Sequence, residues 1–223
     1  MAQVHGVPGE WARVKGMALG MWPIFIGIFV AGFALAMWIW GAAGVGAVLF
    51  AVAVGFTSWS GTRGLRRVER FFKGARGEEK VAGVLAGLPD GYHVFNDFKA
   101  GTDFVDHVVL GPTGVFSVET KCWSGEVTVE EGCVLVNGRL PSRDPLPQAV
   151  RESEMVRGSF AAVGWKGNVV PILVFASDNF RASAIEVGGA VVMNSSGIVG
   201  AITSGSQILS ESEVRRLVSI IES

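Results

Sequence analysis

Residues 106–121 read Asp-His-Val-Val-Leu-Gly-Pro-Thr-Gly-Val-Phe-Ser-Val-Glu-Thr-Lys. Two apolar runs flank the segment 111–114, whose sequence Gly-Pro-Thr-Gly is typical of a tight turn. Apolar runs rich in valine on either side of such a turn indicate two paired strands. The stretch therefore predicts a β-hairpin with strands over 103–110 and 115–121.

Asp106 and Glu119 are expected to face each other across this hairpin, because a turn centred on Pro112 and Thr113 pairs their positions. Their Cβ atoms would lie about 5 Å apart on one face of the sheet. Two carboxylates this close repel each other, and a divalent cation such as Mg²⁺ (or Mn²⁺), which prefers carboxylate oxygens, removes the repulsion. Lys121 lies two residues beyond Glu119, hence on the same face, where its ammonium can orient a water molecule or stabilise charge on a phosphate. Two acids and a lysine around a metal ion are typical of phosphodiester hydrolysis.

Two further polar residues border the apolar faces of predicted helices. Glu78 flanks the core face of a helix expected over 78–88, while Glu79 points away. Glu78 can therefore reach the sheet, although capping of a helix N-terminus explains it equally well. Gln148 borders the apolar stripe of a helix expected over 145–163, and taken alone it is most simply a residue of the helix start.

The rest of the chain after residue 77 alternates between strand and helix patterns. This interleaving predicts an α/β (α+β) fold in which helices flank a mixed sheet. Ser210 and Glu213 form a capping box that predicts the start of a last helix. Further strands are expected over 93–97, 126–129, 133–136, 169–176 and 190–193.

The N-terminal part of the chain is apolar and uncharged. The whole chain holds 19 Lys and Arg against 20 Asp and Glu, with 17% charged residues and a mean hydropathy of +0.42. None of these charges falls within residues 16–62. The apolar run over 17–58 is twice the roughly 20 residues that one bilayer crossing needs. It predicts a transmembrane helical hairpin over 17–59 that turns near 41–44, since a cleavable signal peptide has only about 7–15 apolar residues.

Basic residues on both sides of the hairpin predict its orientation. Arg13 and Lys15 lie in the N-terminal segment 1–16, and the connector 60–76 carries six basic residues and one acid. Because Lys and Arg are enriched in cytoplasmic flanks, we expect a multi-pass protein of the cytoplasmic (inner) membrane with two helices and both termini cytoplasmic. The connector is expected to contact anionic headgroups of the lipid bilayer, although a basic strip also attracts nucleic acid.

Small residues recur every four positions in the second predicted span. They are Ala43, Ala47, Ala51 and Gly55. Such a stripe predicts the surface against which the first span packs. A homo-oligomer formed through the transmembrane hairpin is a further partner that the sequence leaves open.

Four segments of the chain share the pattern of one known family. They are Arg76–Val81, Val105–Val109, Phe116–Gly125 and Asp144–Gln148. Together they resemble the nuclease-related domain (NERD) family, which is placed in the restriction-endonuclease-like Asp…Glu-x-Lys superfamily. The resemblance extends over about residues 74–220, and its most specific part is the Glu-Thr-Lys-x-Trp-x-Gly block that begins at Glu119.

The resemblance implies a restriction-endonuclease-like mixed sheet flanked by helices over 77–223, and a Mg²⁺-dependent nuclease. It implies that Asp106 and Glu119 are metal ligands and that Lys121 is the catalytic lysine. It implies that Glu78 is the helix acid, expected as a further metal ligand, and that Gln148 is an accessory polar residue of the catalytic site.

Two functions are compatible with the sequence. The first is a membrane-anchored, cytoplasm-facing nuclease that hydrolyses phosphodiester bonds of DNA or RNA. The second is a non-catalytic, membrane-tethered module that binds nucleic acid or a protein partner on the same fold. Residues 77–223 hold 11 basic and 18 acidic residues, which favours the second, because nucleases usually present positive surface to their substrate. The complete set of site residues favours the first.

Overall fold

The computed structural model describes residues 1–177, 179–182 and 184–222. It divides into two compact units. One, the helical hairpin unit, is Trp11–Lys73. The other, the sheet domain, combines Met1–Glu10 with the chain from Gly74 onward. The predicted boundaries at residues 16, 59 and 76 remain sequence predictions.

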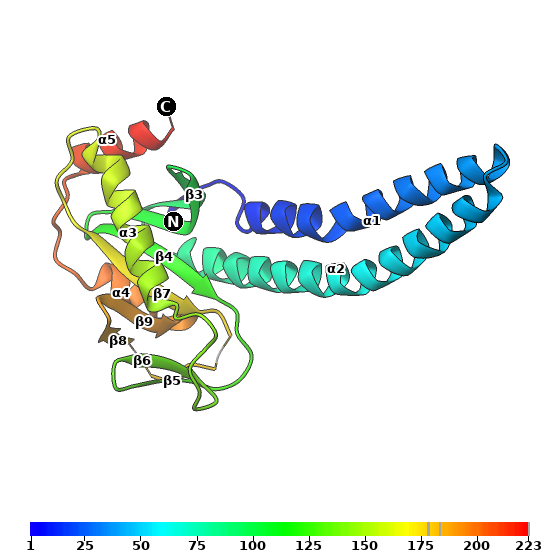
Figure 1. The fold of residues 1–223 in the computed structure, drawn as a ribbon. Coiled ribbons are helices and arrows are strands. Elements are labelled where there is room, and N and C mark those ends of the chain that lie inside the picture. The colour runs from blue at the N-terminus through cyan, green and yellow to red at the C-terminus, as the bar shows by residue number, and fades with distance from the viewer. Residues whose placement is uncertain (178, 183, 223) are drawn as a thin grey trace. The chain divides into compact units, whose positions relative to one another are not determined.

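The sheet domain is built on a seven-stranded mixed sheet, which confirms the predicted fold class (Figure 1). The pairs β1–β2, β4–β7 and β7–β9 are parallel, and the other three pairs are antiparallel. The strand order across the sheet is β1 (Gln3–His5), β2 (His93–Ala100), β3 (Asp103–Gly111), β4 (Gly114–Lys121), β7 (Val169–Phe175), β9 (Ala190–Asn194) and β8 (Ala184–Val187).

Helices cover both faces of this sheet. On one face, Val81 and Leu85 at the end of α2 (Ala43–Leu85) share a core with the short helix α4 (Ile198–Thr203). On the other face, Phe160 and Leu217 belong to the core that α3 (Leu146–Ala161) and α5 (Glu211–Ile221) form with β2 and β3. A two-stranded ribbon packs beside the start of α3, and its strands are β5 (Val127–Glu130) and β6 (Cys133–Val136).

The strands and helices predicted after residue 90 are present, with shifts of a few residues at their ends. The capping box of Ser210 and Glu213 is also confirmed. The separate helix predicted over 78–88 is wrong. It is the end of α2, which runs without a break from Ala43 to Leu85 because this stretch contains no proline.

Four short elements of the described chain lie outside the sequence prediction. They are β1, β8, the 3-10 helix η1 (Ser195–Gly197) and α4, of three, four, three and six residues. Segments this short show at most two periods of a helical or strand pattern, so their sequences do not distinguish them reliably from loops.

The helical hairpin unit contains two helices long and apolar enough to cross a membrane, by length and composition. They are α1 (Glu10–Ile39) and α2, with mean hydropathies of 2.1 and 1.6 over their apolar windows. The chain turns between them at Trp40–Ala42, close to the predicted position, and Gly41 takes a φ of 91° there. The basic segment of the predicted connector is helical and belongs to α2.

The predicted packing stripe in the second span is wrong. Ala43, Ala47, Ala51 and Gly55 are all exposed in this structure. Within residues 43–62, the small residues that α2 buries are instead Gly46, Ala53 and Ser60. They recur every seven residues, because two helices that pack nearly antiparallel meet once every two turns rather than every turn.

Candidate active site

The β3–β4 hairpin has the register that its turn predicts. Its last paired residues are His107 and Val118, so Asp106 and Glu119 occupy the next opposed positions. Beyond that pair, the backbone N–H of Thr120 donates to Oδ2 of Asp106 at 2.8 Å. The Asp106 carboxylate therefore accepts from the backbone of β4 at the place where the paired part of the hairpin ends.

Lys121 lies at the centre of a hydrogen-bonded group on the face of the sheet that α3 covers. Its Nζ forms an ion pair with Oε1 of Glu119 and donates to Oε1 of Gln148 at 3.1 Å. The amide nitrogen of Gln148 donates in turn to Oε1 of Glu119 at 2.8 Å. Three of the predicted site residues, two from β4 and one from α3, are therefore brought together.

Glu152 is a member of this group that the sequence analysis does not identify. It lies one helical turn after Gln148 on α3, and its Oε1 accepts from the Gln148 amide nitrogen at 2.8 Å. Only 4% of the residue is exposed, which is rare for a glutamate. The spacing Gln148-x-x-x-Glu152 is the signal that points to it, because residues four apart share a helix face.

Glu78 lies inside α2 rather than at a helix start, so the alternative reading of Glu78 as an N-terminal cap is wrong. It is buried whereas Glu79 is exposed, as the helical pattern predicts. Its neighbour Gly77 packs directly against Cys122, the residue that follows Lys121 at the end of β4. Glu78 therefore enters the site region from α2, and Gln148 and Glu152 enter it from α3.

His107 follows Asp106 in β3 and faces the other side of the sheet. It is fully buried, and its Nδ1 is 2.8 Å from Oδ1 of Asn96, with which it shares a hydrogen bond. Burial lowers its pKa to about 3, so the ring is neutral. These observations identify His107 as a core histidine.

The comparison with family models gives a match to the nuclease-related domain over residues 73–176. The chain carries a nuclease-related domain. The match begins in α2, ends at the close of β7, and contains all five predicted site residues and Glu152. It stops before residues 177–220, which the sequence resemblance also included. No curated protein and no solved structure matches the chain.

Negative charge accumulates around Asp106 in the nuclease-related domain. Burial raises the pKa of Asp106 well above its usual value, and the carboxylates of Glu119, Glu78 and Glu152 raise it further. The hydrogen bond from Thr120 acts in the opposite direction. Removal of a carboxyl group from water and its placement among other acids both disfavour the charged form. The site thus holds more acid groups than one lysine neutralises.

Neighbouring acids raise the pKa of both Glu152 and Lys121. Burial and the neighbouring Glu119 raise the pKa of Glu152 to about 9, so this carboxyl carries a proton near neutral pH. Its Oε2 has no hydrogen-bond partner among the described residues. Burial lowers the pKa of Lys121, but Glu119, Asp106 and Glu152 outweigh it and raise the pKa overall, so Lys121 stays charged.

The donor set of the nuclease-related domain fits a hard divalent cation. Asp106 and Glu119 offer carboxylate oxygens, and the surplus of acids around Asp106 is the charge that such a cation would balance. No group of three or more His, Cys, Asp or Glu side chains is placed to hold a metal ion in the part of the chain that the structure describes. Mg²⁺ is commonly bound by one or two carboxylates plus water and substrate phosphates. Asp106 and Glu119 suffice for that mode, and Glu78 as a further ligand remains a prediction.

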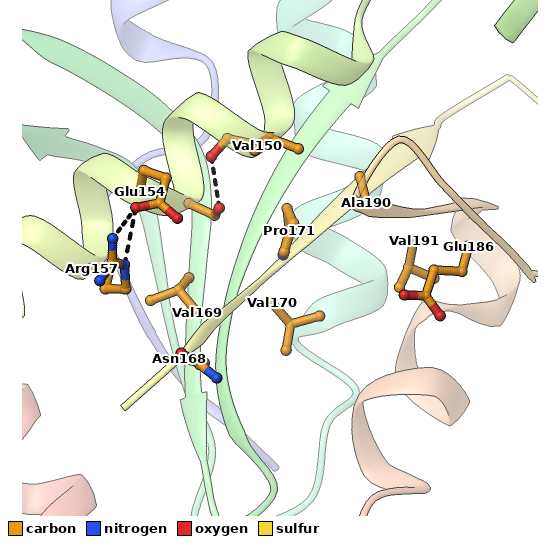
Figure 2. Close-up of a pocket in the computed structure, with 12 residues that line it drawn as sticks. Val150, Glu154, Arg157, Asn168, Val169, Val170, Pro171, Glu186, Ala190 and Val191 are labelled. Atoms are coloured by element: carbon orange, nitrogen blue, oxygen red, sulfur yellow. Dashed lines mark hydrogen bonds and ion pairs between the residues drawn. The ribbon is translucent and has the colours of Figure 1, made fainter. Parts of the chain in front are cut away.

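A separate pocket lies at the opposite end of β7. It has a volume of about 370 Å³ and lies among α3, the start of β7 and the β8–β9 turn (Figure 2). Glu154 and Arg157 form an ion pair on its wall, and Glu186 adds a second acid. One arginine against two glutamates does not favour a phosphate group. This pocket therefore does not extend the candidate active site.

Proposed function

We propose that the chain is a metal-dependent nuclease that hydrolyses phosphodiester bonds of DNA or RNA. The observation that carries this proposal is the position of Lys121, which Glu119 and Gln148 hold on the sheet face where Asp106 faces Glu119. The match to the nuclease-related domain supports it, because that match contains these four residues.

In this proposal, Asp106 and Glu119 would hold the cation, which would supply Lewis-acid polarisation of a phosphate oxygen. Lys121 orients the attacking water or stabilises the charge that grows on the phosphate. Gln148 keeps Lys121 in place, because its amide oxygen accepts from Nζ while its amide nitrogen donates to Glu119.

The test is cleavage of labelled DNA and RNA by the full chain in detergent, with Mg²⁺ and with a chelator. Glu119→Gln and Lys121→Met are expected to lower the rate by about 100-fold or more. Glu131→Gln and Lys166→Met make the same charge changes at exposed positions and should leave the rate unchanged. Equal activity in all five proteins would defeat the proposal.

We also propose that the helical hairpin anchors the domain in the cytoplasmic membrane, with the domain on the cytoplasmic side. Gln3–His5, which precede α1, pair with His93–Phe95 of β2, which follow α2. The chain must therefore be on the same side of the membrane before the first span and after the second. Two crossings satisfy this requirement, and the basic flanks favour the cytoplasmic side.

A non-catalytic binding module is the second candidate function. The excess of seven acidic over basic residues in 77–223 favours it, since a negative surface repels phosphate. Titration of the full chain with Mn²⁺ separates the two candidates. Binding that Asp106→Asn abolishes supports the nuclease, and absence of binding supports the module.

A further inference from the structure

A cavity in the helical hairpin unit combines arginines with apolar side chains. Its volume is about 380 Å³, and it is lined by Leu19 of α1 and by Arg67, Arg70 and Phe71 of α2. Two guanidinium groups and two apolar groups in one cavity match a ligand that is anionic at one end and apolar at the other.

The cavity lies at the level where the uncharged part of α1 begins. Gly16 packs against Phe71, and Gly20 packs against Val68, which places Leu19 beside the arginines of α2. Leu19 belongs to the uncharged run that opens at Gly16. The cavity thus lies where the apolar spans meet the first charged turns of α2, which in a membrane is the headgroup layer.

Aromatic and basic residues continue along the same strip of α2. Trp59, Arg63, Arg67 and Arg70 are spaced by four, four and three residues, so they share one side of the helix. The Arg63 guanidinium lies over the Trp59 ring, 3.9 Å from its centroid. A tryptophan next to arginines is typical of a helix at the membrane interface.

The two arginines of the cavity are available for an anion. No ion pair joins Arg67 or Arg70 to a carboxylate among the residues that the structure describes. Arg66 and Lys73, in the same turns of α2, do not line the cavity. The connector's positive charge is thus divided between a cavity and a separate helix face.

We propose that this cavity binds one anionic phospholipid. Its phosphate lies between Arg67 and Arg70, whose planar guanidinium groups donate paired hydrogen bonds to phosphate oxygens. The first part of an acyl chain lies against Leu19 and Phe71, which free inorganic phosphate would leave uncovered. This inference rests on the proposed insertion of the hairpin into a membrane.

The test is native mass spectrometry of the full chain, released from detergent with phosphatidylglycerol or phosphatidylcholine added. One phosphatidylglycerol per chain should be retained, with a preference over phosphatidylcholine of about 30-fold, as two basic residues near a membrane surface provide. The double variant Arg67→Gln/Arg70→Gln should lose this preference. The double variant Arg66→Gln/Lys73→Gln removes the same charge from α2 and should keep it.

Three results would overturn the proposal. Equal loss of preference in both double variants would indicate diffuse attraction to the whole basic segment. Absence of a preference in the wild-type chain would show that no selective site exists. Displacement of the lipid by inorganic phosphate at similar concentration would assign the cavity to free phosphate. Carbonate extraction of membranes that contain the chain tests the anchoring separately, and a chain that is released defeats the anchoring whatever the lipid result.

Discussion

Gln148 and Glu152 lie one turn apart on α3, and the amide nitrogen of Gln148 donates to Oε1 of Glu152 at 2.8 Å. The same nitrogen donates to Glu119. Both amide hydrogens thus have acceptors, and this fixes the amide oxygen toward Lys121. Glu152 therefore determines which way the Gln148 amide is turned.

Glu152→Gln should make the domain more stable at alkaline pH. The pKa of Glu152 is raised to about 9 in the folded chain, so the folded state holds a proton that the unfolded state has lost above its ordinary pKa of about 4.5. The stabilisation that this group contributes is complete below about pH 4.5. It falls as the pH rises toward 9, by at most about 1.4 kcal/mol for each pH unit. Thermal unfolding in chelator can be followed by tryptophan fluorescence. Its midpoint temperature should fall less steeply between these pH values in the variant than in the wild type.

Metal binding should strengthen as the pH rises. Burial and the surrounding acids raise the pKa of Asp106, and a carboxylate must lose its proton before it can bind a cation. Mn²⁺ affinity measured by electron paramagnetic resonance should therefore increase from about pH 5 to pH 8. Asp103→Asn, at an exposed position of the same strand, serves as the control and should behave like the wild type. A pH-independent affinity would contradict the assignment of Asp106.

Gln148→Ala should impair the reaction less than Lys121→Met. Loss of Gln148 removes one hydrogen bond from Lys121 but leaves the ion pair with Glu119. We expect a fall in kcat of about tenfold, against about 100-fold or more for the lysine. Steady-state cleavage rates in Mg²⁺ measure both. A larger effect at Gln148 than at Lys121 would mean that the roles are assigned wrongly.

Gly77→Ala and Gly83→Ala in α2 should have opposite effects on stability. A Cβ at Gly77 would lie 2.7 Å from Cβ of Cys122, an atom fixed to the backbone, whereas a Cβ at Gly83 meets nothing within 4 Å. We expect Gly77→Ala to lower the free energy of unfolding by about 1–3 kcal/mol and Gly83→Ala to raise it by about 0.5–1 kcal/mol. Thermal unfolding of the two variants distinguishes them. Gly77→Ala should also reduce cleavage, because it displaces the neighbouring Glu78.

The exposed thiol of Cys133 reports the orientation in the membrane. Cys133 is an exposed free cysteine in the domain, so a membrane-impermeant maleimide should label it in broken cells but not in intact ones. Ala42→Cys, placed in the turn between α1 and α2, should be labelled in intact cells because the proposed topology puts this turn on the far side. Labelling of Cys133 from outside would reverse the proposed topology.

The sequence predicts most of the candidate site because that part of the site depends on local rules. A symmetric turn determines which residues face each other, so Asp106, Glu119 and Lys121 could be placed on one face from their spacing. Glu152 is not predicted from the sequence, because a glutamate on a helix is usually solvated. Only the fold shows that this one is buried. The three residues of β1 have no pattern of their own, since their partners in β2 lie about 90 positions further along the chain.

The pairing of β1 with β2 also determines how the hairpin and the domain follow each other along the chain. The helical hairpin unit, Trp11–Lys73, is an insertion within the domain, because the domain's chain begins before it and resumes after it. During synthesis the edge strand emerges first and has to wait until both helices and the first half of β2 have been made. Completion of the sheet is therefore coupled to the correct folding of the hairpin, and a fragment that starts after the hairpin lacks one edge of its sheet.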